Sequence, residues 1–452
     1  KDIERMTNEN EIVFVINKKA YRVTNWVKYH PGGPETISNY AGKDATAVFN
    51  VFHPEEVAEK KLKNFYIGDV TDAEVDNYTK EFLDLHQEVK KAGMYNTSVF
   101  YYIIKFVWVY SLWALSAYLV LGRESYAEHM LGAFVMAWFL QQVAFLGHDS
   151  GHNGVSHYRD IDKTIGLFVG PFSSGISIAW WKSNHNTHHV VTNSVDHDPD
   201  IQHLPVFCVN HRLFKSLYSY YYKRVMDFDA AAKLLIRVQH YLFYPIMSVA
   251  RFNLYFQSLN MLFTRDYVER RWAEIVAMFS YFTWFTVLAM QLPTWGETVS
   301  FILISHMVAG ILHVQICCSH FSMDTFQGPL LREQIDSGKD LDFFRHQLAT
   351  SLNIDSNWMT HWFHGGLQFQ IEHHLFPRLP RHSLKYVKPM VMKFCKRHNV
   401  DYYSISFLRA NQEIFRTLKK TAGKVGKEIN EKDEIQQELK NGHLYHGFHA
   451  IG

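Results

Sequence analysis

The sequence predicts an α-helical integral membrane protein with four transmembrane helices, a cytosolic helical cap and a small α+β domain at the N-terminus. Three observations predict this fold class. Four long apolar runs lie between residues 97 and 318, the first 75 residues are mixed and polar, and histidines gather in three groups after the second run. A hydrocarbon core of about 30 Å needs roughly 20 helical residues, so each run is long enough to cross it.

Residues 1–75 form the predicted N-terminal domain. A strand over 11–16 precedes the motif His30-Pro31-Gly32-Gly33, and His53 follows a helix-like stretch. Proline fixes the entry to a turn, and two glycines let the backbone approach a flat group closely. Two histidines with apolar residues between them can hold a haem from both faces. We expect a haem b site with His30 and His53 as ligands, although the motif alone also suits an ordinary turn.

A predicted linker, 76–96, leads into the predicted membrane domain, 97–420. The four long apolar runs, arranged in two close pairs, favour membrane-spanning helices over the buried core helices of a large soluble protein. Between the pairs lies a long segment, 193–271, that is rich in lysine and arginine and is therefore expected in the cytosol. The haem domain and the histidine groups then face the cytosol, and a charged, flexible tail is expected over 421–452. The predicted spans are 97–121, 126–147, 272–292 and 298–318.

The three histidine groups indicate a metal centre. Their spacings of three and four residues place each group on one face of a helix. Seven histidines exceed what one ion can hold, so two ions are expected, and imidazole suits iron, copper, nickel and zinc. The seven are His148, His152, His185, His188, His189, His373 and His374.

Three interpretations of these groups compete. Structural zinc usually takes cysteine ligands, and no cysteine lies in the groups. A surplus of surface histidines is the second. The third is a di-iron centre at the membrane edge. The haem domain favours this interpretation, because an oxygen-activating iron pair needs electrons delivered one at a time, whereas a zinc hydrolase needs no electron carrier.

Composition excludes little else. The net charge is +2, so nothing indicates a nucleic-acid partner. The four cysteines form no CxxC pair and no disulfide framework, which indicates a reducing compartment.

The N-terminal stretch resembles cytochrome b5, and the HxxxH, HxxHH and QxxHH boxes resemble those of the membrane fatty-acyl desaturase and hydroxylase superfamily. Gln370 stands where many members have histidine, which, with the N-terminal domain, resembles the front-end desaturases. The resemblance extends to about residue 420 and implies the seven histidines as iron ligands. It also implies Gln370 as a weak or indirect partner and a further ligand after the fourth span, for which His320 fits.

The resemblance implies an O2-dependent lipid desaturase of the endoplasmic reticulum membrane, multi-pass, with two Fe ions. Electrons would come from NADH through a separate cytochrome b5 reductase to the haem. Segments 193–205, 250–255 and 362–370 look like those of sphingolipid Δ8 desaturases, which favours the long-chain base of a ceramide as substrate. Δ6 and Δ5 fatty-acyl desaturases share the boxes and stay an alternative. A b5-fused lipid hydroxylase and a non-catalytic membrane haem protein are further alternatives.

Other residues near the boxes have open roles. Asp149 and Glu372 either orient imidazoles or face solvent. Trp180-Trp181 either line an acyl channel or anchor at the membrane interface.

Overall fold

The N-terminal domain is a three-stranded antiparallel sheet packed with short helices in the computed structural model, which describes residues 2–71, 76–330 and 341–427. The predicted tail lies mostly outside these ranges. Strand β2 pairs with β1 and β3, and the register of the β2–β3 pair shifts between Ala20 and Tyr21. The elements are α1 (Asp2–Asn8), β1 (Val13–Ile16), β2 (Lys19–Arg22), η1 (Val27–Tyr29), α2 (Pro34–Ser38), α3 (Thr46–Phe52), α4 (Glu55–Lys60), η2 (Leu62–Phe65) and β3 (Tyr66–Asp69).

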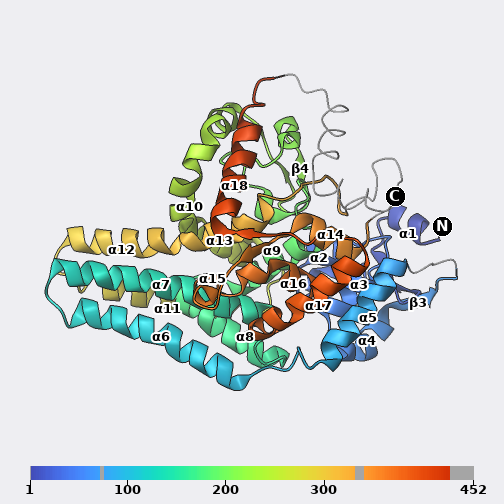
Figure 1. Cartoon of the computed structure of the whole chain (residues 1–452), viewed down its shortest axis with the longest axis horizontal. Helices are drawn as coiled ribbons and strands as arrows, with labels where there is room; N and C mark the ends of the chain where they lie inside the picture. The colour runs from blue at the N-terminus through green and yellow to red at the C-terminus, as the bar shows by residue number, and fades with distance from the viewer. Residues whose placement is uncertain (1, 72–75, 331–340, 428–452) are drawn as a thin grey trace.

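Four helices are long and apolar enough to cross a membrane, as the sequence predicts: α6 (Val99–Leu121), α7 (Tyr126–Gly151), α11 (Arg271–Ala289) and the pair α12 (Trp295–Ala309) with α13 (Ile311–His320). They run side by side and project to the left in Figure 1. Ser98 and Ser125 begin α6 and α7, where each hydroxyl accepts a hydrogen bond from a free backbone N–H. The length and apolar composition of the four helices suit a membrane protein.

The fourth span is interrupted at Gly310, which the sequence analysis does not predict. A Cβ on Gly310 would lie 2.6 Å from the backbone Cα of Ser248 in α10 (Ala230–Thr264). Glycine is required there because α10 packs directly against the break. Figure 1 shows α10 standing at the inner end of α12, beside α18 (Phe407–Ala422).

The remaining elements join the two domains into one packed body. Helix α5 (Asn77–Lys91), within the predicted linker, buries Phe82 in a hydrophobic cluster that also holds Val48 of the N-terminal domain and Phe376. The other elements are α8 (Arg159–Leu167), a π-helical segment (Phe168–Phe172), α9 (Ile178–Val190), η4 (Pro199–Ile201), η5 (His211–Lys215), β4 (Tyr218–Ser219), β5 (Arg224–Val225), α14 (Phe343–Thr350), β6 (Asn353–Asp355), α15 (His361–His364), η6 (Leu367–Phe369), α16 (Gln370–Leu375), η7 (Arg381–Ser383), α17 (Leu384–Arg397) and β7 (Ser404–Ser406).

Candidate metal centre and haem cleft

Four of the predicted ligands form a first group where α7, α9 and α16 meet. The ligand nitrogens of His148, His152, His185 and His373 all lie within 4.8 Å of one another. The Nε2 atoms of His148, His152 and His373 are buried and have no hydrogen-bond partner among the described residues. Buried polar atoms are normally paired, so these nitrogens fit a metal ion.

A second group lies beside the first and contains His188, His320 and His374, whose ligand nitrogens also lie within 4.8 Å of one another. The amide nitrogen of Gln370 lies 3.1 Å from His320 Nε2 and 3.3 Å from His374 Nε2. Its Oε1 is buried and unpaired within the described chain. Rotating the amide by half a turn would direct this oxygen, a metal-ligating atom, at the same imidazoles.

His189 lies between the two groups. Its Nε2 is 3.1 Å from His185 Nε2 in the first group, and its ring centroid is 4.1 Å from that of His374 in the second. Its Nδ1 is buried without a partner among the described residues. All seven predicted histidines, His320 and Gln370 are therefore adjacent in space, and the donor set fits two neighbouring metal ions. Metal binding by these residues stays a prediction.

Several residues that the sequence analysis missed orient these rings through the second ring nitrogen. Asp198 lies 2.9 Å from His188 Nδ1, Gln347 Oε1 lies 2.8 Å from His374 Nδ1, and the carbonyl oxygen of Thr350 lies 3.2 Å from His320 Nδ1. Such partners fix the ring and its tautomer, leaving Nε2 for a metal. Of these three partners only Asp198 could have been suspected from the sequence, because it follows the second histidine box closely.

The electrostatics also suit metal binding. Burial lowers the pKa of His185 to about 3 and holds the pKa values of His373 and His374 well below the ordinary value. Burial alone would lower the pKa of His188 too, but the carboxylates of Asp198 and Asp200 raise it above the ordinary value. A neutral imidazole is the form that binds a metal, so most of the site is already in that form at neutral pH.

Trp181 forms one wall of the first group. Its ring centroid lies 4.5 Å from that of His185 and 5.3 Å from that of His148. A Cβ on Gly151 would lie 2.0 Å from the Trp181 ring, so the HDSGH motif requires its glycine for this contact. Trp181 therefore lies at the metal centre.

The two acidic residues inside the boxes have different partners. Asp149 forms an ion pair of 2.7 Å with Arg381 and lies 3.6 Å from His148 Nδ1, so it bears on a predicted ligand. Glu372 is fully buried and accepts hydrogen bonds from Asn353 and Tyr402. It therefore anchors α16 to the segments beside it.

A cavity of about 720 Å³ lies at the N-terminal domain and contains the two predicted haem ligands. The ring centroids of His30 and His53 lie 6.1 Å apart. Their Nδ1 atoms contact the carbonyl oxygens of Gly33 at 2.9 Å and Phe49 at 3.1 Å, which leaves each Nε2 for an iron. The volume is within the range of about 300–1,000 Å³ that is usual for ligand sites. The cleft therefore fits a haem with two axial imidazoles.

The haem cleft and the metal centre share a wall. Gly151, His152 and Asn186 line the cleft from the membrane domain. The ring of Phe52, next to His53, lies 6.0 Å from the His189 ring. The N-terminal domain thus lies directly against the helix that carries the second box.

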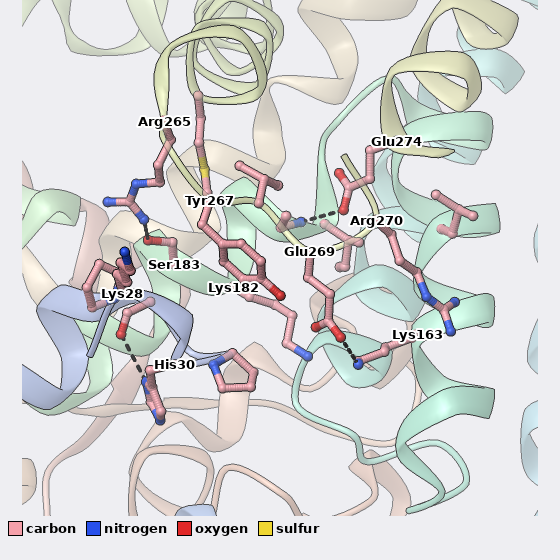
Figure 2. Close-up of a pocket in the computed structure, with 18 of the residues that line it drawn as sticks. Lys28, His30, Lys163, Lys182, Ser183, Arg265, Tyr267, Glu269, Arg270 and Glu274 are labelled. Carbon is pink, nitrogen blue, oxygen red and sulfur yellow. Dashed lines mark hydrogen bonds and ion pairs between the residues drawn. The ribbon is translucent and has the colours of Figure 1, made fainter. Parts of the chain in front are cut away.

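The contact between the domains is polar as well as apolar. The hydroxyls of Thr36 and Thr187 lie 3.1 Å apart, and Arg265 pairs with Glu35 at 2.8 Å. Figure 2 shows Arg265 also reaching Ser183 of α9, to which it donates a hydrogen bond of 2.7 Å. These contacts tie α2 to α9.

Comparisons with known proteins match two parts of the chain. Residues 1–71 match the cytochrome b5-like heme/steroid binding domain, and residues 128–406 match fatty acid desaturases. A Delta(8)-fatty-acid desaturase of Helianthus annuus is 40% identical over 93% of this chain and 90% of its own length. An acyl-lipid (9-3)-desaturase of Borago officinalis is 38% identical over 90% and 89%. A Delta 8-(E)-sphingolipid desaturase of Emericella nidulans is 30% identical over 99% and 97%.

Proposed function

The chain belongs to the fatty acid desaturase family and carries a cytochrome b5-like domain, and from this premise we propose that it is an O2-dependent Δ8 desaturase of the long-chain base of a ceramide. The observation that carries the chemistry is the pair of adjacent imidazole groups beside the haem cleft. When bound, the haem would supply single electrons and the iron pair would activate O2.

The residues that would hold the two ions follow from the grouping. His148, His152, His185 and His373 would hold one, and His188, His320 and His374 the other. His189 would serve at the boundary, and Gln370 would be a weak ligand or orient the ligands around it. Asp198 and Gln347 would keep the rings turned inward, and Trp181 would help to exclude water from the first group.

The relatives' names support the Δ8 position but divide on the substrate, since the plant relatives from Helianthus annuus and Arabidopsis thaliana are named Delta(8)-fatty-acid desaturases. Fungal relatives from Emericella nidulans and Kluyveromyces lactis are named Delta 8-(E)-sphingolipid desaturases. The second candidate is a fatty-acyl substrate with Δ6 or Δ5 chemistry, which the Borago officinalis relative named an acyl-lipid desaturase supports. In either case the protein must fix one carbon pair of the alkyl chain at the metals, because its methylenes are chemically alike.

Two further proposals concern the supply of electrons and the location of the protein in the cell. A separate cytochrome b5 reductase would pass electrons from NADH to the haem. The basic segment 193–271 supports a cytosolic orientation of the haem domain and the metal centre, in the endoplasmic reticulum membrane.

Expression in a host without Δ8-unsaturated lipids tests the proposal. Mass spectrometry of sphingoid bases and fatty acids should show a sphingoid base that has lost two hydrogens, with the double bond at carbon 8. The same assay on His188→Ala gives the background. A product heavier by one oxygen would contradict desaturation, and unsaturation confined to fatty acids would contradict the sphingoid substrate.

A further inference from the structure

Two cations of the membrane domain line the haem cleft. They are Lys182 of α9 and Arg378, which follows α16. Neither forms a hydrogen bond or an ion pair within the described chain, whereas Arg159, a third cation at the cleft, lies 3.5 Å from Glu269. In Figure 2 the amino group of Lys182 lies between His30 and the ion pair of Lys163 with Glu269.

The charge around Lys182 is unbalanced. Burial, followed by the neighbouring cations Arg159 and Lys163, lowers the pKa of Lys182 to about 8 against the opposing effects of Glu269 and Asp162, so three cations face two carboxylates there. Burial likewise lowers the pKa of Arg378, against the weaker opposing effects of Tyr95 and Asp162. A charge withdrawn from water is costly unless it is paired, so both positions favour an anion in the cleft.

The cations lie near different haem ligands. Lys182 and Arg159 act electrostatically on His30, and Arg378 acts on His53. A haem b held by these histidines carries two propionate carboxylates on one edge of its ring. Carboxylates bind lysine and arginine through charge-assisted hydrogen bonds, which are stronger than neutral ones.

We propose that Lys182 and Arg378 bind the haem propionates, so that the membrane domain completes a haem site whose axial ligands belong to the N-terminal domain. The proposal rests on haem binding by His30 and His53, and it is independent of which lipid is desaturated. It makes the haem a contact between the two domains.

Haem release from the purified full chain tests this proposal. Transfer of haem to excess apomyoglobin, followed by absorbance, should be about tenfold faster for Lys182→Gln and for Arg378→Gln, because a charged hydrogen bond contributes about 1.5 kcal/mol or more. Arg378→Lys should release haem at an intermediate rate, because lysine keeps the positive charge. Lys163→Gln makes the same charge change next to Lys182 but outside the haem cleft, and it should release haem at the wild-type rate.

A haem dimethyl ester, which lacks the carboxylates, separates charge pairing from damage to the fold. The wild-type chain should lose the ester about as fast as the variants do. The haem midpoint potential should also fall in both glutamine variants, since removing a nearby cation disfavours the reduced iron.

Wild-type rates of release in both variants would overturn the proposal, as would variants that lose the ester much faster than the wild-type chain does. A chain that binds no haem would overturn the haem site itself, whereas the lipid assay tests the desaturation separately.

Discussion

The haem cleft and the metal centre both depend on imidazoles, but they position them differently. In the cleft, His30 and His53 are held by backbone carbonyls only three and four residues away. In the metal centre, His374 is held by a side chain 27 residues away and His320 by a carbonyl 30 residues away. The predicted haem ligands are thus oriented locally, and the predicted metal ligands are oriented by the folded membrane domain.

Because of this difference, losing a predicted ligand of one site should leave the predicted ligands of the other site oriented. Haem absorbance reports on the N-terminal domain, and non-haem iron reports on the assembly of segments from α7 to α16. Four substitutions would test whether the two sites can be lost separately.

Replacing His188 should separate the two sites most clearly. In His188→Ala we expect desaturation to fall more than about 100-fold, because even changes to partners of metal ligands cost 10–100-fold. The haem spectrum should be unchanged, and non-haem iron should fall below the two ions expected per chain. His240→Ala, a buried histidine outside both groups, is the control and should keep its iron. Loss of the haem spectrum in His188→Ala would show that the sites are not independent.

Replacing His30 should give the opposite pattern. His30→Ala should lose haem binding and most turnover with the reductase, yet retain non-haem iron, because its imidazole belongs to the cleft alone. Absorbance, metal analysis and product formation measure the three quantities. Added imidazole should fill the vacated ligand position and restore part of the spectrum. Unchanged turnover without haem would contradict electron supply through this domain.

Removing a charge behind a metal ligand should have an intermediate effect. Asp198→Asn removes the carboxylate next to His188 Nδ1, and we expect a loss of metal affinity of about 10–100-fold. Iron titration of the metal-free protein measures this loss. Asp160→Asn, at an exposed aspartate that pairs with Arg270 and not with a predicted ligand, should bind iron as the wild type does. Equal affinities in Asp198→Asn and the wild type would show that His188 is oriented in another way.

The smallest effect concerns the contact between the domains. Thr36→Val removes the hydroxyl that meets Thr187 and should lower stability by about 0.5–1.5 kcal/mol, while haem and iron contents stay unchanged. Thermal unfolding followed by fluorescence measures it. Thr264→Val, at an exposed threonine that bonds only its own helix, should be neutral. An equal loss in both variants would mean that the interface hydrogen bond contributes nothing.

The fold class could be predicted because apolar length is a local property of sequence. The break at Gly310 could not, because a single glycine within an apolar run does not show which backbone packs against it. The sequence also did not show that the apolar stretches between residues 230 and 264 form one continuous helix, α10, of 35 residues.

The histidines themselves were visible as spaced groups, and the structure brings all of them together. Their partners were not visible, because Gln347 and Thr350 carry no motif and reach the site only through folding. Lys182 and Arg378 were missed for the same reason, since each looks like an ordinary surface cation until the N-terminal domain covers it.

The tie between α2 and α9 has a kinetic consequence. A carrier that diffused freely would have to find this face in every catalytic cycle, at a rate set by its concentration. A carrier attached to the chain and seated on that face turns the encounter into a first-order event with a high effective concentration. The collision left to diffusion is then the one with the reductase, so turnover should respond to reductase supply and stay insensitive to dilution of the desaturase itself.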